Sequence, residues 1–121
     1  VVIACPLTPV TKNMIGKREL SEMKSTAFII NIARGEIINE AALINALQNK
    51  TLAGAALDVF EKEPLPKESP LFALDNVFLS PHISGNFPEY QHDVMVQFAD
   101  NLNRYFAGKD LKNRVCKKRL Y

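Results

Sequence analysis

Hydrophobic residues occur along the chain in continuous runs rather than in alternation with polar residues. The runs are Val1–Cys5, Ala27–Ile32, Ala53–Phe60 and Val77–Leu79. Polar side chains interrupt them mainly at Asn31 and Asp58. Apolar runs of this length are typical of strands that are covered on both faces, as in parallel sheets. The pattern therefore predicts four parallel strands.

Helical patterns alternate with these strands. Lys17–Met23 places Leu20 and Met23 on one side, and Asn39–Asn49 has a clearer apolar face made by Leu43, Ala46 and Leu47. Asn39 is suited to cap the second helix, because its side-chain oxygen can accept a hydrogen bond from the first turn. Strands that alternate with helices predict βαβ units with right-handed crossovers. The predicted fold class is therefore α/β, with a doubly wound parallel sheet.

The last third of the chain follows a different pattern. Prolines 64, 66 and 70 exclude a long helix from Glu61–Asp75, so we expect an ordered connecting loop there. A final helix is expected from about Pro88 to Ala107, with Pro88 in its first turn and Gly108 just after its end. Its apolar stripe consists of Val94, Phe98, Leu102 and Tyr105, widened by Met95 and Phe106.

Polar residues that can carry chemistry follow the predicted strands. Arg34 follows the second strand, Asp58 and then Glu63 follow the third, and His82 follows the fourth. Ligands of open parallel sheets bind outside the carboxyl ends of the strands, so Arg34, Glu63 and His82 are expected to converge. Taken singly, each has an ordinary alternative: an arginine paired with Glu36 or Glu40, a surface acid, and a histidine that caps a strand. Asp58 needs hydrogen-bonding partners at the end of an apolar strand.

The three residues together suit the reduction of a 2-keto acid. The planar guanidinium of Arg34 matches a carboxylate and can polarise the neighbouring keto group. A carboxylate such as Glu63 favours the protonated form of an adjacent imidazole. His82 can then protonate the keto oxygen as hydride arrives, and it can act as the base in the reverse direction.

Composition narrows the class of protein. The 121 residues are 47% hydrophobic and 23% charged, with a net charge of +2, as in an ordinary globular domain. Two cysteines form neither a disulfide framework nor a metal cluster, and they fit a reducing, cytoplasmic compartment. No apolar run approaches a membrane span. Basic residues gather near the end without a nucleic-acid motif, so we expect neither a nucleic acid nor a membrane as a partner.

Four segments occur in an order and spacing that resemble the NAD(P)-dependent D-2-hydroxyacid dehydrogenases. They are PLTPVTKNMIG, MKSTAFIINIARGEIINEAALINAL, LAGAALDVFEKEPLP and NVFLSPHISG, and the resemblance covers nearly the whole chain. The family includes phosphoglycerate dehydrogenases and glyoxylate/hydroxypyruvate reductases. The resemblance implies an oxidoreductase that uses NAD or NADP, a small 2-keto or 2-hydroxy acid as substrate, and a homodimer.

The resemblance also implies roles for individual residues. Arg34 would bind the substrate, Glu63 would partner the histidine, and His82 would be the acid/base. Asp58 would hold the nicotinamide carboxamide. The cofactor would be lined, largely through the main chain, by Cys5, Pro6, Thr11, Ile32, Ala33, Arg34, His82, Ser84 and Gly85.

The Gly-rich phosphate loop of this family is absent from the chain, as is the residue that selects NAD or NADP. We therefore expect the C-terminal portion of a longer two-domain subunit, inactive by itself. Residues 1–86 would form half of the cofactor domain, and residues 87–121 a return helix and tail. A non-catalytic NAD(H)-sensing, corepressor-like protein on the same fold, or an inactive fragment, is the alternative. A formate dehydrogenase would carry Gln in place of Glu63.

Overall fold

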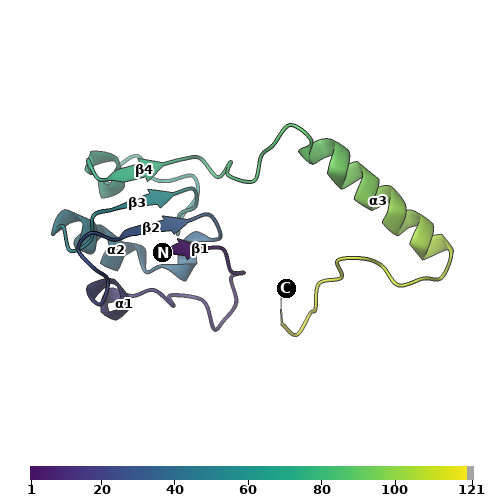
Figure 1. Cartoon of the computed structure of the whole chain (residues 1–121), viewed down its shortest axis with the longest axis horizontal. Helices are drawn as coiled ribbons and strands as arrows, with labels where there is room; N and C mark the ends of the chain where they lie inside the picture. Colours follow the sequence, from purple (N-terminus) through teal and green to yellow (C-terminus); the bar gives the residue numbers. More distant parts are fainter. Residues whose placement is uncertain (120–121) are drawn as a thin grey trace. The chain divides into compact units, whose positions relative to one another are not determined.

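The computed structural model describes residues 1–119 (Figure 1). The chain divides into two compact units, with the boundary between Ser84 and Gly85. The first unit contains every strand of the described chain, and the second contains the long helix α3. The assignment of residues 1–86 and 87–121 to parts of two domains stays a prediction.

The first unit is built around a parallel sheet of four strands in the order β1-β2-β3-β4. The strands are β1 (Val2–Ile3), β2 (Phe28–Asn31), β3 (Gly54–Leu57) and β4 (Val77–Leu79). All three neighbouring pairs are parallel, which confirms the predicted α/β class and sheet type. Because the strands share one direction, their carboxyl ends lie at one edge of the sheet, which we call the carboxyl edge.

The strands are shorter than the apolar runs that predicted them. β2 ends at Asn31 and β3 ends just before Asp58, although hydrophobic residues continue beyond both positions. After β2 the Asn31 side chain accepts a hydrogen bond from the Ala33 N–H, whereas the Asp58 side chain after β3 accepts hydrogen bonds from the N–H groups of Ile83 and Ser84. The end of β3 agrees with the prediction that Asp58 follows this strand, whereas β2 stops one residue before the apolar run ends at Ile32.

Helices connect the strands as predicted. They are α1 (Lys17–Ser21) and α2 (Glu40–Gln48), with the 3-10 turns η1 (Gly35–Ile37) and η2 (Pro70–Ala73). The Asn39 side chain accepts a hydrogen bond from the Ala42 N–H at 2.9 Å, which confirms the predicted N-cap of α2. The connecting loop at 61–75 holds η2 and a cis peptide bond before Pro64.

The core of the first unit lies on one face of the sheet. Its fully buried side chains come from β2, α1, α2 and the turns: Leu20, Ile29, Ile37, Ile38, Leu43, Leu47, Leu52 and Leu71. Alternate strand residues point to the other face and stay exposed, with Val2 at 61% and Phe78 at 77%. We predicted that both faces of the sheet are covered, but the described residues cover only one face.

The second unit contains α3 (Tyr90–Phe106). It begins two residues later than predicted, because Glu89 is the N-cap and Pro88 precedes it. Its end follows the prediction: Gly108 has a φ of +64°, and the N–H groups of Gly108 and Lys109 donate to the carbonyls of Tyr105 and Arg104. The predicted apolar stripe is exposed throughout, with no buried residue in the helix.

Candidate active site

Arg34 lies in a turn that a buried side chain holds together. Asn31, only 1% exposed, accepts a hydrogen bond from the Ala33 N–H at 3.0 Å through its side-chain oxygen. Its amide nitrogen donates to the Arg34 carbonyl at 2.9 Å. The turn therefore leaves β2 with a fixed backbone and an exposed arginine. The sequence pattern marked Asn31 only as an interruption, so its supporting role was missed.

Gly35 follows Arg34 because two backbone segments meet there. A Cβ atom at this position would collide with the Phe60 carbonyl group and the Glu61 nitrogen. Residues 60 and 61 begin the loop that leads to Glu63. The absence of a side chain at Gly35 thus lets the arginine turn lie directly against the loop that carries the glutamate.

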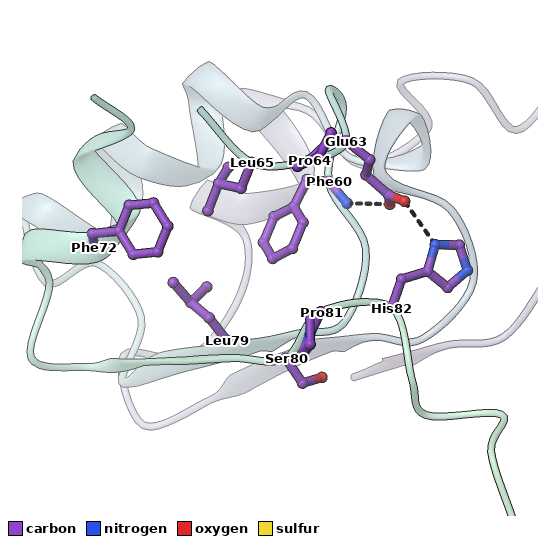
Figure 2. Close-up of a pocket in the computed structure, with 9 residues that line it drawn as sticks. All are labelled: Phe60, Glu63, Pro64, Leu65, Phe72, Leu79, Ser80, Pro81 and His82. Atoms are coloured by element: carbon purple, nitrogen blue, oxygen red, sulfur yellow. Dashed lines mark hydrogen bonds and ion pairs between the residues drawn. The ribbon is translucent and has the colours of Figure 1, made fainter. Parts of the chain in front are cut away.

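Glu63 and His82 form a hydrogen-bonded pair (Figure 2). The His82 Nδ1 atom lies 2.7 Å from Oε2 of Glu63. The other carboxylate oxygen of Glu63 accepts a hydrogen bond from the Phe60 N–H at 3.0 Å. Both oxygens are therefore engaged, and the remaining ring nitrogen of His82, Nε2, points away from Glu63.

The surroundings of Glu63 favour its ionised form. The hydrogen bond with His82 is the largest influence that lowers the pKa of Glu63, and burial opposes it. The Phe60 N–H and the positive charge of Arg34 lower the pKa further. The positive charge of Arg34 thus helps to keep Glu63 ionised.

The ordinary alternatives for Arg34 find no support. Neither Glu36 nor Glu40 forms an ion pair with it within residues 1–119. Glu40 instead accepts a hydrogen bond from the Glu61 N–H at 3.1 Å. The guanidinium donates to the Ala33 carbonyl at 2.6 Å and is otherwise accessible.

Asp58 is buried at the end of β3, with 3% of its surface exposed. One carboxylate oxygen accepts hydrogen bonds from the Ser80 hydroxyl and, at 2.9 Å, the Ile83 N–H. The other accepts from the Ser84 N–H at 2.9 Å. Burial raises the pKa of Asp58, but these hydrogen bonds outweigh burial and hold the pKa well below its ordinary value. Ser80 was not among the predicted site residues.

An apolar cavity of about 650 Å³ adjoins the pair. Side chains from the 60–72 loop and from β4 line it, with Phe60, Leu65, Phe72 and Leu79 contributing hydrophobic surface (Figure 2). Glu63 and His82 stand at one end of it, and neither Arg34 nor Asp58 lines it. The cavity therefore lies beside the candidate catalytic groups rather than between them.

The other predicted cofactor residues have structural surroundings of their own. The Thr11 hydroxyl donates to the Pro6 carbonyl at 2.8 Å and so closes the turn after β1. Cys5 is a half-buried free thiol, and Ile32 is exposed beyond β2. Gly85 belongs to the second unit, so it is not placed relative to the others. Their contacts with a cofactor stay predictions.

Among residues 1–119, no three side chains of the metal-ligating types come together. Across the same range, none of the helices combines the length and the hydrophobicity that crossing a membrane requires.

The first unit coincides with a known sequence family. The family model for the D-isomer specific 2-hydroxyacid dehydrogenase, NAD binding domain, matches residues 1–84. The chain belongs to this family. The match ends where the first compact unit ends.

Individual relatives agree with the family assignment. The chain is 46% identical over 113 residues to glyoxylate/hydroxypyruvate reductase B from Enterobacter agglomerans, covering 93% of this chain and 35% of that protein. A D-isomer specific 2-hydroxyacid dehydrogenase from Xanthobacter autotrophicus Py2, solved with NADPH, is 41% identical with a TM-score of 0.92, covering 99% of this chain and 49% of that one. The chain therefore spans about a third of the length of the curated relatives it matches.

A second solved relative supports the same fold. It is an NADPH-dependent glyoxylate/hydroxypyruvate reductase from Sinorhizobium meliloti, in complex with NADP and sulfate. It is 30% identical, with a TM-score of 0.90, and the match covers 99% of this chain and 39% of that chain.

Replacing Gly35 by Ala should destabilise the first unit, because the new Cβ pushes the arginine turn away from the backbone at Phe60. Overpacking of this kind costs about 1–3 kcal/mol, measurable by urea unfolding. Gly85→Ala is the matched control, since no atom lies within 4 Å of its added Cβ. Equal midpoints for the two variants would contradict the close approach.

The lowered pKa of Glu63 predicts which pH range weakens the pair. A carboxyl group whose pKa falls on folding stabilises the fold above its ordinary pKa and loses that contribution as the pH drops through the lowered value. Carbon-13 NMR of the Glu63 carboxyl should give a midpoint below the usual value of about 4.3. His82→Asn should move it upward, and a midpoint that is the same in both proteins would count against the pair.

Proposed function

We propose that this chain supplies the substrate-binding and acid/base residues of an NAD(P)-dependent D-2-hydroxyacid dehydrogenase. Such an enzyme transfers a hydride between a nicotinamide cofactor and C2 of a small 2-keto or 2-hydroxy acid. The observation that carries the proposal is the 2.7 Å contact between His82 and Glu63 on the carboxyl edge that also bears Arg34. Because the chain spans about a third of its relatives, we propose that other parts of the subunit hold the cofactor phosphates.

In the direction of reduction, Arg34 binds the substrate carboxylate through its two parallel N–H donors. Its positive charge also polarises the adjacent keto group. The nicotinamide supplies the hydride when it is bound. His82 gives the proton on Nε2 to the keto oxygen as the carbon–hydrogen bond forms at C2, so that the oxygen becomes a neutral hydroxyl group while the carboxylate keeps its charge.

Glu63 supports this proton transfer in two ways. Its negative charge stabilises the imidazolium that must exist before reduction, and its hydrogen bond to Nδ1 turns Nε2 toward the substrate side. In the oxidation direction the neutral ring accepts the alcohol proton, and the same carboxylate stabilises the cation that results.

The carboxyl edge suits the nicotinamide end of a dinucleotide. Ile32 is exposed beyond β2 and offers apolar contact to a planar ring. We propose NAD or NADP as the cofactor. The solved relatives bound to NADPH and NADP support this cofactor class.

We propose small 2-keto acids such as glyoxylate and hydroxypyruvate as substrates, because two of the relatives are glyoxylate/hydroxypyruvate reductases. We also propose a homodimer in the cytoplasm. The exposed apolar face of the sheet, with Val2, Phe28 and Phe78, supports burial against further protein in the complete molecule.

A screen of the complete subunit tests the reaction class. Glyoxylate, hydroxypyruvate, pyruvate and phosphohydroxypyruvate are each offered with NADH and NADPH, and the loss of absorbance at the reduced nicotinamide is followed. The proposal expects turnover of at least one acid. Tight cofactor binding without any turnover would favour the NAD(H)-sensing, corepressor-like alternative.

Arg34→Lys in the complete subunit should lower kcat/KM for the keto acid by roughly tenfold or more, because a point charge cannot replace the two-pronged guanidinium. Both KM and kcat should change. Arg18→Lys is the matched control, since Arg18 is an exposed residue paired only with Glu22 on α1. Activity of Arg34→Lys within about threefold of wild type would reject the assigned role.

Glu63→Gln should shift the pH dependence of keto-acid reduction. Removing the negative charge disfavours imidazolium, so the rate should begin to fall at a lower pH than in wild type. Glu61→Gln, two residues away in the same loop, should leave the profile in place. Identical profiles for wild type and Glu63→Gln would separate Glu63 from the proton transfer.

A further inference from the structure

His82 has an unusual backbone conformation for a non-glycine residue. Its φ is +55°, in the left-handed region. A side chain in this region is disfavoured by contact between Cβ and the backbone, and the conformation persists only where surrounding groups hold it. The candidate acid/base is therefore presented by a turn that needs support.

The Asp58 carboxylate provides that support from both sides. It accepts a hydrogen bond from the hydroxyl of Ser80, which precedes His82, and hydrogen bonds from the N–H groups of Ile83 and Ser84, which follow His82. The Ser80 N–H in turn donates to the Leu57 carbonyl at 2.9 Å, which ties the same segment to β3. His82 is the middle residue of this segment, 80–84, which Asp58 holds at both ends.

The donors require an ionised carboxylate. Asp58 forms no ion pair within residues 1–119, so its charge is satisfied there by the hydroxyl and amide donors. Protonation would place a donor opposite other donors. Burial of the group makes an unsatisfied contact costly, because water cannot replace it.

We propose that Asp58 and Ser80 are positioning residues that hold His82 in its left-handed conformation, so that its ring meets Glu63 and directs Nε2 to the substrate. The catalytic part of this proposal rests on the proposed function, whereas the conformational part does not. It adds to the expected contact of Asp58 with the cofactor carboxamide, and the two roles predict different results.

The contact with Glu63 cannot do this alone. That hydrogen bond fixes one ring atom of a side chain that is 45% exposed. The Asp58 contacts fix the backbone from which the ring projects. Loss of the backbone support should therefore weaken the contact between the ring and Glu63, even though the hydrogen bonds of Asp58 are to Ser80 and to the N–H groups of Ile83 and Ser84 rather than to the ring.

The test compares Ser80→Ala, Ser80→Thr and Asp58→Asn in the complete subunit. Ser80→Ala removes one donor, and Ser80→Thr restores a hydroxyl. Asp58→Asn places an amide group against a backbone N–H. Asp75→Asn, an exposed aspartate outside the site, is the matched control. Three quantities are measured: the nitrogen-15 NMR signals of the His82 ring, kcat for keto-acid reduction, and the Kd of NADPH.

We expect Ser80→Ala to lower kcat by about tenfold, the usual effect of one lost hydrogen bond to a charged group, with the Kd of NADPH unchanged. Ser80→Thr should recover most of the loss. The ring signal of the Nδ1 hydrogen bond to Glu63 should weaken in Ser80→Ala and in Asp58→Asn.

If Ser80→Ala leaves kcat unchanged and Asp58→Asn weakens NADPH binding, the positioning role would be overturned and Asp58 would remain a cofactor-binding residue. An unchanged ring signal in both variants would overturn it as well. If the wild-type subunit reduces no keto acid, the ring signals still decide the conformational part, so failure of the proposed function is distinguished from failure of the support.

Discussion

The need to satisfy two buried polar side chains determines the shape of the carboxyl edge. Asn31 and Asp58 are the buried polar or charged residues of the described chain, and they lie at the ends of neighbouring strands. The Asp58 N–H donates to the Asn31 carbonyl at 3.0 Å, so the two ends are linked directly. Each side chain then binds the backbone of a turn, and those turns carry Arg34 and His82. The hydrogen bonds that satisfy the two buried side chains are thus the same ones that hold the turns of Arg34 and His82.

A second constraint brings Glu63 into the same region. The turn at Gly35 lies against the backbone of Phe60 and Glu61, which only a residue without Cβ allows. The Phe60 N–H then binds one carboxylate oxygen of Glu63 and leaves the other for His82. The arginine, the glutamate and the histidine therefore depend on backbone contacts among three strand ends, and none of them is placed by its own side chain alone.

The sequence predicted the order of strands and helices, the N-cap at Asn39 and the close of α3 at Gly108, because each depends on local pattern or on one capping group. It also predicted which strand ends carry polar groups. It could not predict that β2 stops at Asn31, since an apolar run does not show where a side chain replaces a ladder hydrogen bond. The left-handed conformation of His82 has no local signal either, because long-range contacts to Asp58 impose it. The coverage of the second sheet face was expected from the continuous apolar runs, and the described residues leave that face exposed.

We propose that Arg34 and the His82–Glu63 pair act on one substrate at the carboxyl edge. A crystal structure of the complete subunit with NADPH and oxalate, an unreactive mimic of a 2-keto acid, would show whether they do. We expect a carboxylate of oxalate on the guanidinium of Arg34 and an oxygen within hydrogen-bonding distance of Nε2 of His82. Oxalate bound with full occupancy away from Arg34, or with Nε2 of His82 turned to solvent, would contradict it.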